Sequence, residues 1–179
     1  MDESSSMRRL WAPWRLEWIK ESSQGVKDCF LCDMLNDSPE NERENLLLYR
    51  GEAAFLVMNR YPYTNGHLMV APKRHLRDMM QLDAKEWAEI GLLTQVGLEA
   101  LKNTISPQGF NLGWNLGRLS GAGLEDHLHQ HIVPRWDGDT NFMPVVGQTR
   151  VISQDLWECY DLVKKEIDSL RIPSEPGGA

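Results

Sequence analysis

Five apolar or alternating runs, divided by turn residues, predict the strands of the protein. They span residues 46–50, 53–59, 67–72, 110–117 and 127–135. Gly51 separates the first two runs and indicates a hairpin. In the fourth run, Phe110, Leu112, Trp114 and Leu116 alternate with Asn and Gly. This alternation is typical of a strand with one buried face.

Two further stretches repeat apolar residues at helical spacing. In the first, Asp83 and Glu86 have the spacing of a capping box, and Ser106-Pro107 predicts the end of the helix. The second follows Ser153, the expected N-cap, and carries Leu156, Val163, Ile167 and Leu170. The order strands, helix, strands, helix predicts an α+β domain with an antiparallel sheet.

Length and composition fit one globular domain. The chain has 179 residues, of which 41% are hydrophobic and 25% are charged, enough to form a core. We expect a flexible segment at 1–7, a single domain at 8–170 and a disordered tail at 171–179. Residues 33–45 are predicted to form a polar loop with a helical turn at most.

The net charge and the number of cysteines limit the binding partners and the cellular compartment that the sequence predicts. A net charge of -7 argues against a general nucleic-acid binder, which usually has a basic face, but not against a small anionic ligand. No apolar run approaches the roughly 20 residues of a membrane helix, and the N-terminus lacks the apolar stretch of a signal peptide. Three cysteines do not form a disulfide framework. We therefore expect a cytoplasmic enzyme without a membrane or nucleic-acid partner.

Three alternating histidines predict the functional site. His127, His129 and His131 have the period of a strand and should project from one face. Each buried imidazole needs hydrogen-bond partners, so three in a row are costly as core filler. Such a row can bind a metal, or one imidazole can attack a phosphorus centre while its neighbours orient it. The glycine loop 121–123 lies just upstream, where backbone N–H groups can hold phosphate oxygens.

A second candidate is the C-x-x-C motif formed by Cys29 and Cys32. On its own, this pair fits half of a zinc site, a redox pair or two reduced buried thiols. A thioredoxin-like redox role is disfavoured because the pair lacks a βαβ context. A zinc site would need two more ligands.

Several longer segments resemble the histidine triad family. HLHQHIV at 127–133 is similar to the family signature, NRYPYTNGHLMVAPKRH at 59–75 to its upstream strands, and FNLGWNLG at 110–117 to the segment before the triad. LWAPWRLEWI at 10–19 and HIVPRWDGDTNFMPVVG at 131–147 resemble the bacterial branch related to diadenosine tetraphosphate phosphorylases. The resemblance implies about five antiparallel strands with one long and one C-terminal helix. It also implies a homodimer or higher homo-oligomer, paired through a sheet edge and the long helix.

The same resemblance implies a nucleotide hydrolase or nucleotidyltransferase. His129 takes the place of the nucleophile that attacks the α-phosphate of a dinucleoside polyphosphate, such as diadenosine tetraphosphate, to form a nucleotidyl-histidine. His131 and His67 would flank the phosphate and stabilise its developing charge. The acceptor, water or inorganic phosphate, stays open, although GDTNF at 138–142 favours a phosphorylase.

Contacts to an adenine nucleotide also follow from the resemblance. The implied nucleotide-binding residues are Asn59 at the ribose, Asn115 at the phosphate or nucleophile, Gly121, Ala122 and Gly123 in the phosphate-side loop, and His131. Many members carry Ser or Gln in that loop, whereas here it continues with Leu124 and Glu125. A side-chain donor to the leaving group is therefore missing or comes from elsewhere.

Zinc-bearing members, and the related galactose-1-phosphate uridylyltransferases, join a C-x-x-C to two histidines at matching places. All four positions are filled here, by Cys29, Cys32, His75 and His127. The resemblance therefore implies a structural Zn²⁺.

Three other functions remain open. A histidine triad protein that binds AMP or ADP as a regulator, with slow phosphoramidase activity, would keep the pocket and turn over slowly. A sugar-phosphate uridylyltransferase is disfavoured because that family has glutamine where His131 stands. A purely metal-binding module would hold several metals and would not react with diadenosine tetraphosphate.

Overall fold

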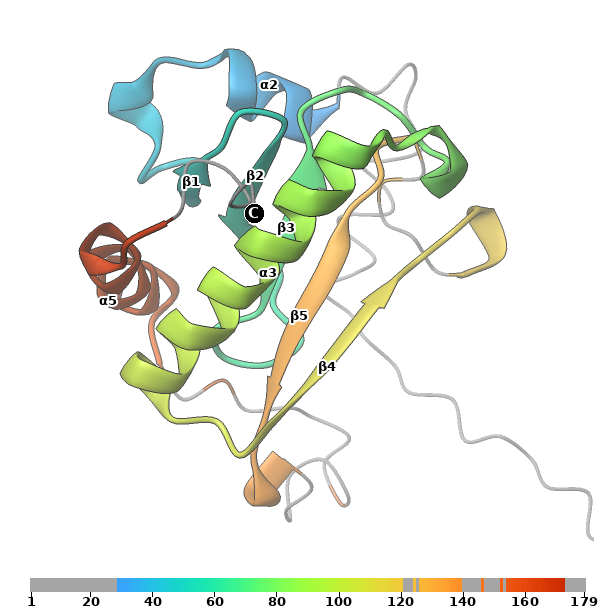
Figure 1. Ribbon diagram of the computed structural model, residues 1–179. Coiled ribbons are helices and arrows are strands. Elements are labelled where there is room, and N and C mark those ends of the chain that lie inside the picture. The colour runs from blue at the N-terminus through green and yellow to red at the C-terminus, as the bar shows by residue number, and fades with distance from the viewer. Residues whose placement is uncertain are drawn as a thin grey trace, which may run out of the picture. The chain divides into compact units, whose positions relative to one another are not determined.

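Five antiparallel strands form one sheet, as predicted (Figure 1). In chain order they are β1 (Leu47–Arg50), β2 (Ala54–Met58), β3 (Leu68–Pro72), β4 (Gly109–Trp114) and β5 (Gln130–Arg135). Across the sheet their order is β1-β2-β3-β5-β4. The predicted hairpin between β1 and β2 turns at Gly51, whose N–H donates to the carbonyl of Ala54 at 2.9 Å.

The computed structural model describes residues 29–120, 126–139 and 154–172, together with Leu124, Val146 and Ile152. Nearly all of them belong to one unit, residues 28–139 and 152–179; of a second unit, 1–27 and 140–151, only Val146 is described. The predicted flexible segment 1–7 lies outside the described residues, as does the tail from residue 173. Ile172, at the start of that predicted tail, packs against the core.

The two predicted helices are α3 (Ala84–Ile105) and α5 (Leu156–Ser169). The predicted capping box of α3 is confirmed, because the Asp83 and Glu86 side chains each accept from the other's backbone N–H. The helix ends at Ser106, as predicted, with a left-handed φ of 47°. The predicted cap of α5 was wrong: Asp155, two residues after Ser153, accepts from two N–H groups of the first turn.

The close packing of α3 shows which side chains lie on each face of the sheet. α3 lies across β2, β3 and β5 (Figure 1), and α5 packs against α3 and β1. A Cβ placed on Gly97 of α3 would meet Ile132 at 3.2 Å and Leu68 at 3.3 Å. Since Leu68 and Ile132 face α3, the preceding residues His67 and His131 face the opposite side of the sheet.

The outer strand β4 is less buried than its pattern predicts. Leu112 is 47% exposed and Leu116, beyond the strand, is 48% exposed. The reason is that α3 covers β2, β3 and β5 and leaves part of the edge strand open. Trp114 does pack edge-on against Trp87 of α3, with ring centroids 6.1 Å apart.

Strand β5 begins three residues later than predicted. Only His131 of the histidine row lies within it, because β3 ends at Pro72 and residues 127–129 run beside the loop that follows β3. There the N–H of Leu128 donates to the carbonyl of Leu76 at 2.6 Å. The row thus extends from that loop into the sheet.

The other helices among the described residues are short. The 3-10 helices are η1 (Pro39–Asn41), η2 (Met79–Gln81), η3 (Arg118–Ser120) and η4 (Asp137–Asp139). A helix that the sequence did not predict, α2 (Phe30–Asn36), begins directly after Cys29 and replaces part of the predicted polar loop. None of the described helices is both long enough and apolar enough to cross a membrane.

Candidate active site and metal cluster

A main-chain carbonyl fixes the proton on the buried ring of His129. Its Nδ1 lies 2.8 Å from the carbonyl oxygen of His127. Because a carbonyl only accepts, Nδ1 carries the proton and Nε2 holds a lone pair. Burial lowers the pKa of His129 below its usual 6.5, which keeps the ring neutral at pH 7. A neutral imidazole with its lone pair on Nε2 has the form a nucleophile needs.

A second chain of hydrogen bonds begins at His67, which is fully buried. The backbone N–H of Tyr63 donates to its Nδ1 at 3.1 Å. The Nδ2 of Asn59 also lies 3.2 Å from this Nδ1, and the Asn59 amide is oriented by the N–H of Tyr61, which donates to Oδ1 at 2.9 Å. Two donors meet Nδ1, so the proton of His67 must be on Nε2.

His67 passes this polarity to His131. The Nε2 of His67 lies 2.9 Å from the Nδ1 of His131, so His131 accepts on Nδ1 and carries its own proton on Nε2. Burial, followed by the nearby His131 and His129 rings, lowers the pKa of His67 to about 3. This chain of hydrogen bonds therefore places an N–H on Nε2 of His131 while the His67 ring stays uncharged.

The far end of this chain is Asn115, just beyond β4. Its Nδ2 lies 3.2 Å from the Nε2 of His131, which would place two donors face to face. Turning the amide by 180° brings Oδ1 to His131 and resolves the conflict, as the polarity of the chain requires. An acceptor such as a phosphate oxygen could take the same N–H.

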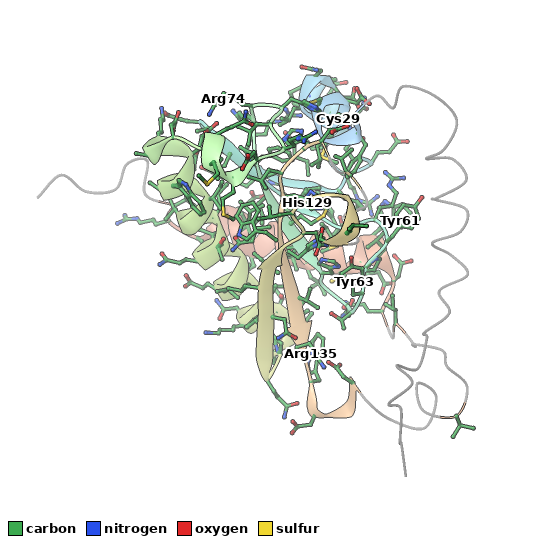
Figure 2. All side chains as sticks on the ribbon, turned by 90° about the vertical axis from the view of Figure 1, so that its right-hand side faces the viewer. Cys29, Tyr61, Tyr63, Arg74, His129 and Arg135 are labelled. Carbon is green, nitrogen blue, oxygen red and sulfur yellow. The ribbon has the colours of Figure 1, made fainter. Side chains whose placement is uncertain are left out.

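The ring of Tyr63 packs beside two of the three histidines. The ring centroid of Tyr63 lies 4.5 Å from that of His67 and 5.7 Å from that of His131. The rings of His129 and His131 are 4.9 Å apart. In Figure 2, His129 lies between Cys29 and Tyr63 in the view. His129 and His131 thus share one site, although only His131 belongs to the sheet.

Cys29, Cys32, His75 and His127 form a cluster whose ligand atoms all lie within 4.8 Å of one another. The Sγ of Cys29 lies 3.1 Å from the Nδ1 of His127, and the Sγ of Cys32 lies 3.3 Å from the Nδ1 of His75. A tetrahedral zinc, with bonds of about 2.3 Å to sulfur and about 2.0 Å to nitrogen, keeps its ligand atoms about 3.4–3.8 Å apart. The cluster is thus close to the size of a zinc site.

The orientation of His127 also fits a metal ligand. Its Nε2 donates to the carbonyl of Pro72 at 2.8 Å, which leaves the lone pair on Nδ1, toward the thiols. Metal-bound histidines commonly donate their other ring N–H to a carbonyl in this way. Burial, with the adjacent Cys29, raises the pKa of the Cys32 thiol to about 11. Without a metal this thiol is protonated at pH 7, and a bound cation would release the proton.

Residues 40–138 match the sequence profile of the HIT domain. The chain belongs to the histidine triad family. It is 36% identical to the AP-4-A phosphorylase of Mycobacterium tuberculosis over 168 residues, which cover 92% of this chain and 86% of the relative. The expected family is thereby confirmed.

Solved structures of histidine triad proteins share the fold. A hypothetical histidine triad nucleotide-binding protein from Sulfolobus tokodaii is 25% identical, with a TM-score of 0.61 over 78% of this chain and 92% of its own. A Zn-bound histidine triad family protein from Mycobacterium smegmatis is 23% identical, with a TM-score of 0.60 over 78% of this chain and 91% of its own. The second likeness supports the α+β fold alone.

The fold brings together most of the site residues that the resemblance to the histidine triad family implied. His67, His129 and His131 lie together, and Asn115 contacts His131. Asn59, expected at the ribose, lies against His67. The loop residues Gly121, Ala122 and Gly123 lie outside the described residues. The individual roles of all these residues stay predictions.

Sequence reasoning missed the contribution of Tyr63. Its segment, 59–75, was singled out only because it resembles the family's upstream strands, whereas the backbone N–H of Tyr63 sets the polarity of the His67–His131 chain. No side-chain pattern could reveal a donor that belongs to the main chain. The two tyrosines in the turn were the available signal for its aromatic contacts.

Proposed function

We propose that the protein cleaves adenine dinucleoside polyphosphates, such as diadenosine tetraphosphate, through a nucleotide bound covalently to His129. The observation that carries this proposal is the hydrogen bond from His129 Nδ1 to the His127 carbonyl, which leaves the lone pair on Nε2. His131, 4.9 Å away between ring centroids, supports the same assignment. The Mycobacterium tuberculosis relative, named AP-4-A phosphorylase, supports the substrate class.

In the first step, Nε2 of His129 attacks the α-phosphorus and forms a P–N bond as the P–O bond to the leaving nucleotide breaks. The N–H of His131 donates to a phosphate oxygen whose charge grows in the transition state. His67 and Asn59 hold His131 in the donating tautomer. Asn59, Asn115 and the loop residues Gly121, Ala122 and Gly123 complete the proposed nucleotide contacts. In the second step, an acceptor oxygen attacks phosphorus and the P–N bond breaks.

Inorganic phosphate is the acceptor we propose. A relative that covers 92% of the chain is named AP-4-A phosphorylase, and phosphate would convert an adenylyl-histidine into ADP. Incubation with diadenosine tetraphosphate should therefore yield ATP and ADP only when phosphate is present. AMP and ATP formed in water alone would identify a hydrolase. Tight AMP binding with slow turnover of every nucleotide would instead favour a regulatory binding protein.

We further propose that Cys29, Cys32, His75 and His127 hold one structural zinc ion. The donor set, the spacing of the ligand atoms and the Nε2 hydrogen bond of His127 support it. When bound, the ion would tie α2 and the loop after β3 to the start of the histidine row. Elemental analysis should find one zinc per chain, and a metal-free protein of equal stability would contradict this.

We propose a homodimer paired through β4 and α3. β4 lies at the edge of the sheet, and Leu112 on β4 and Trp87 on α3 are 47% and 43% exposed. Light scattering should find a dimer that Leu112→Glu converts to a monomer. Leu162 on α5 is also 47% exposed, so Leu162→Glu is the matched control and should stay dimeric.

A cytoplasmic location completes the proposal. Cys29, Cys32 and Cys159 are not joined in disulfides, and cysteines stay unoxidised in a reducing compartment. Cell fractionation tests the location directly.

A further inference from the structure

Helix α2 carries half of the metal cluster yet has little of its own to hold it in place. It has seven residues, the side chain of its N-cap Cys29 makes no capping hydrogen bond, and its last turn lacks a basic residue. Within it, Leu31 and Met34 are the buried side chains. A helix this short is not stable by itself in water, so contacts from outside must set its position.

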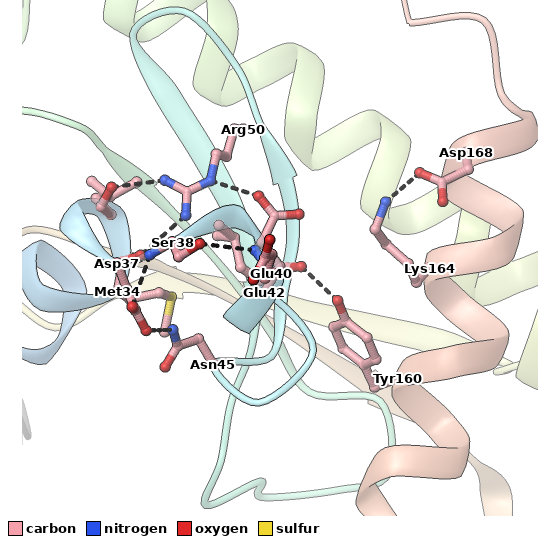
Figure 3. A network of polar contacts seen from close by, with 12 residues as sticks. Met34, Asp37, Ser38, Glu40, Glu42, Asn45, Arg50, Tyr160, Lys164 and Asp168 are labelled. Atoms are coloured by element: carbon pink, nitrogen blue, oxygen red, sulfur yellow. Dashed lines mark hydrogen bonds and ion pairs between the residues drawn. The ribbon is translucent and has the colours of Figure 1, made fainter.

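Arg50, the last residue of β1, supplies such contacts (Figure 3). Its Nη1 donates to the carbonyl of Leu35 at 2.8 Å and its Nη2 to the carbonyl of Met34 at 3.2 Å. Its Nε donates to Glu42 at 2.6 Å. The two carbonyls belong to the last turn of α2, where no intrahelical partner exists. One planar guanidinium therefore caps the C-terminal end of α2. It ties this helix to β1 and to Glu42, which lies in the segment between α2 and β1.

We propose that Arg50 is a positioning residue for the metal cluster. It touches none of the four ligands, but it fixes α2, and α2 fixes where the Sγ atoms of Cys29 and Cys32 lie relative to His127. A thiol pair held in place loses less freedom when a metal binds, so affinity rises with pre-organisation. This inference rests on the proposed zinc site.

The segment that carries His75 is held in a similar way. Arg74, next to His75, donates from Nε and Nη2 to the two carboxylate oxygens of Glu86 at 2.7 and 2.6 Å. Its Nη2 also donates to the carbonyl of Gln81 at 2.8 Å. Glu86 is 2% exposed and belongs to the capping box of α3. An arginine that is not a ligand thus anchors each side of the cluster.

The test measures zinc affinity of the full-length chain by competition with a chromophoric chelator. Arg50→Met should weaken zinc binding about 10- to 100-fold, the range seen when residues that support metal ligands are changed. Arg43→Met is the matched control. Arg43 also makes a paired contact to a carboxylate, Asp161, at 2.8 and 2.9 Å, but it is exposed and does not contact α2. Its variant should bind zinc within about twofold of the wild type.

Cobalt provides a readout that general destabilisation would not move. With Co²⁺ in place of zinc, the wild type should show the strong visible absorption of a tetrahedral site, and Arg50→Met should weaken or shift it while Arg43→Met does not. If Arg50→Met does not fold, Arg50→Lys carries the test. It keeps the charge near Glu42 but lacks the fork, and should bind zinc at least about threefold more weakly.

Three results would overturn the inference. Zinc affinity could be unchanged in the Arg50 variants, it could fall equally in the Arg43 control, or the cobalt spectrum could be identical in all variants. A wild-type protein that takes up no zinc would instead refute the zinc site itself, before any variant is compared.

Discussion

The catalytic histidines and the metal cluster lie side by side but are held in different ways. At the histidines, main-chain atoms decide where each proton lies: the His127 carbonyl for His129 and the Tyr63 N–H for His67. At the cluster, side chains of Arg50 and Arg74 hold the segments that carry the ligands. The comparison teaches that the reactive tautomers come with the fold, whereas the positions of Cys29, Cys32 and His75 depend on replaceable side chains.

His127 joins the two regions. Its Nδ1 faces the thiols, and its carbonyl accepts the hydrogen bond that Nδ1 of His129 donates. A change at the cluster should therefore reach the nucleophile through a single residue, while a change in the His67 chain should not reach the cluster.

The largest effect is expected from His129→Ala. Removing the nucleophile should lower kcat at least about 10⁴-fold, the scale found when a covalent catalyst is deleted, while AMP binding and the fold stay intact. Product analysis measures turnover, and calorimetry measures AMP binding. Turnover near the wild-type rate would end the covalent mechanism.

Zinc removal should have the next largest effect, because it acts on both regions. A metal present at 1,000 times its Kd adds about 4 kcal/mol to folding stability, so the chelated protein should melt roughly 8–16 °C lower. Turnover should also fall, since the His127 carbonyl would lose its anchor. The Cys159→Ala variant is the control, because Cys159 lies outside the cluster. Equal melting temperatures of the zinc-loaded and chelated proteins would contradict this prediction.

Asn59→Asp tests the polarity of the His67 chain. A carboxylate beside Nδ1 of His67 attracts a proton there, which reverses the chain or charges the ring, and kcat should fall about 10²-fold. Nitrogen NMR of the ligand-free protein should show the proton of His67 on Nε2 in the wild type and on Nδ1 in the variant. Asn111→Asp, at an exposed position of β4 where the side chain accepts from Arg135, should change neither. A wild-type His67 with its proton on Nδ1 would contradict the derivation.

The sequence contained the fold because its determinants are local. The Asp83–Glu86 capping box and the alternation in β2 and β3 act between residues near in the chain. α2 could not be predicted, because a carbonyl cap from Arg50, 15 residues away, holds it. Leu112 was misjudged because burial of an edge strand depends on which strands α3 covers. Site residues were recognisable by type, but their tautomers depend on backbone atoms that no residue letter reveals.

A smaller effect concerns pH. Burial lowers the pKa of His129, so kcat/KM should keep more than half of its plateau at pH 6.5 and reach half of it only at lower pH. Burial lowers the pKa of His67 to about 3, while an unfolded histidine titrates near 6.5. The stability from this neutral ring is therefore present above pH 6.5 and lost as pH falls toward 3. A pH–rate profile and melting curves measure both; an activity midpoint above 6.5 would show a charged resting His129.

The smallest effect is expected from Tyr63→Leu. This variant distinguishes the side chain of Tyr63 from its backbone N–H. The ring of Tyr63 contributes contacts to His67 and His131 worth about 1 kcal/mol, but the donor that orients His67 is the backbone N–H, which the variant keeps. We expect kcat within about threefold of the wild type and unchanged nitrogen NMR signals for His67. A loss as large as that of Asn59→Asp would mean that the side chain sets the polarity, and the catalytic histidines would then depend on replaceable side chains as the metal cluster does.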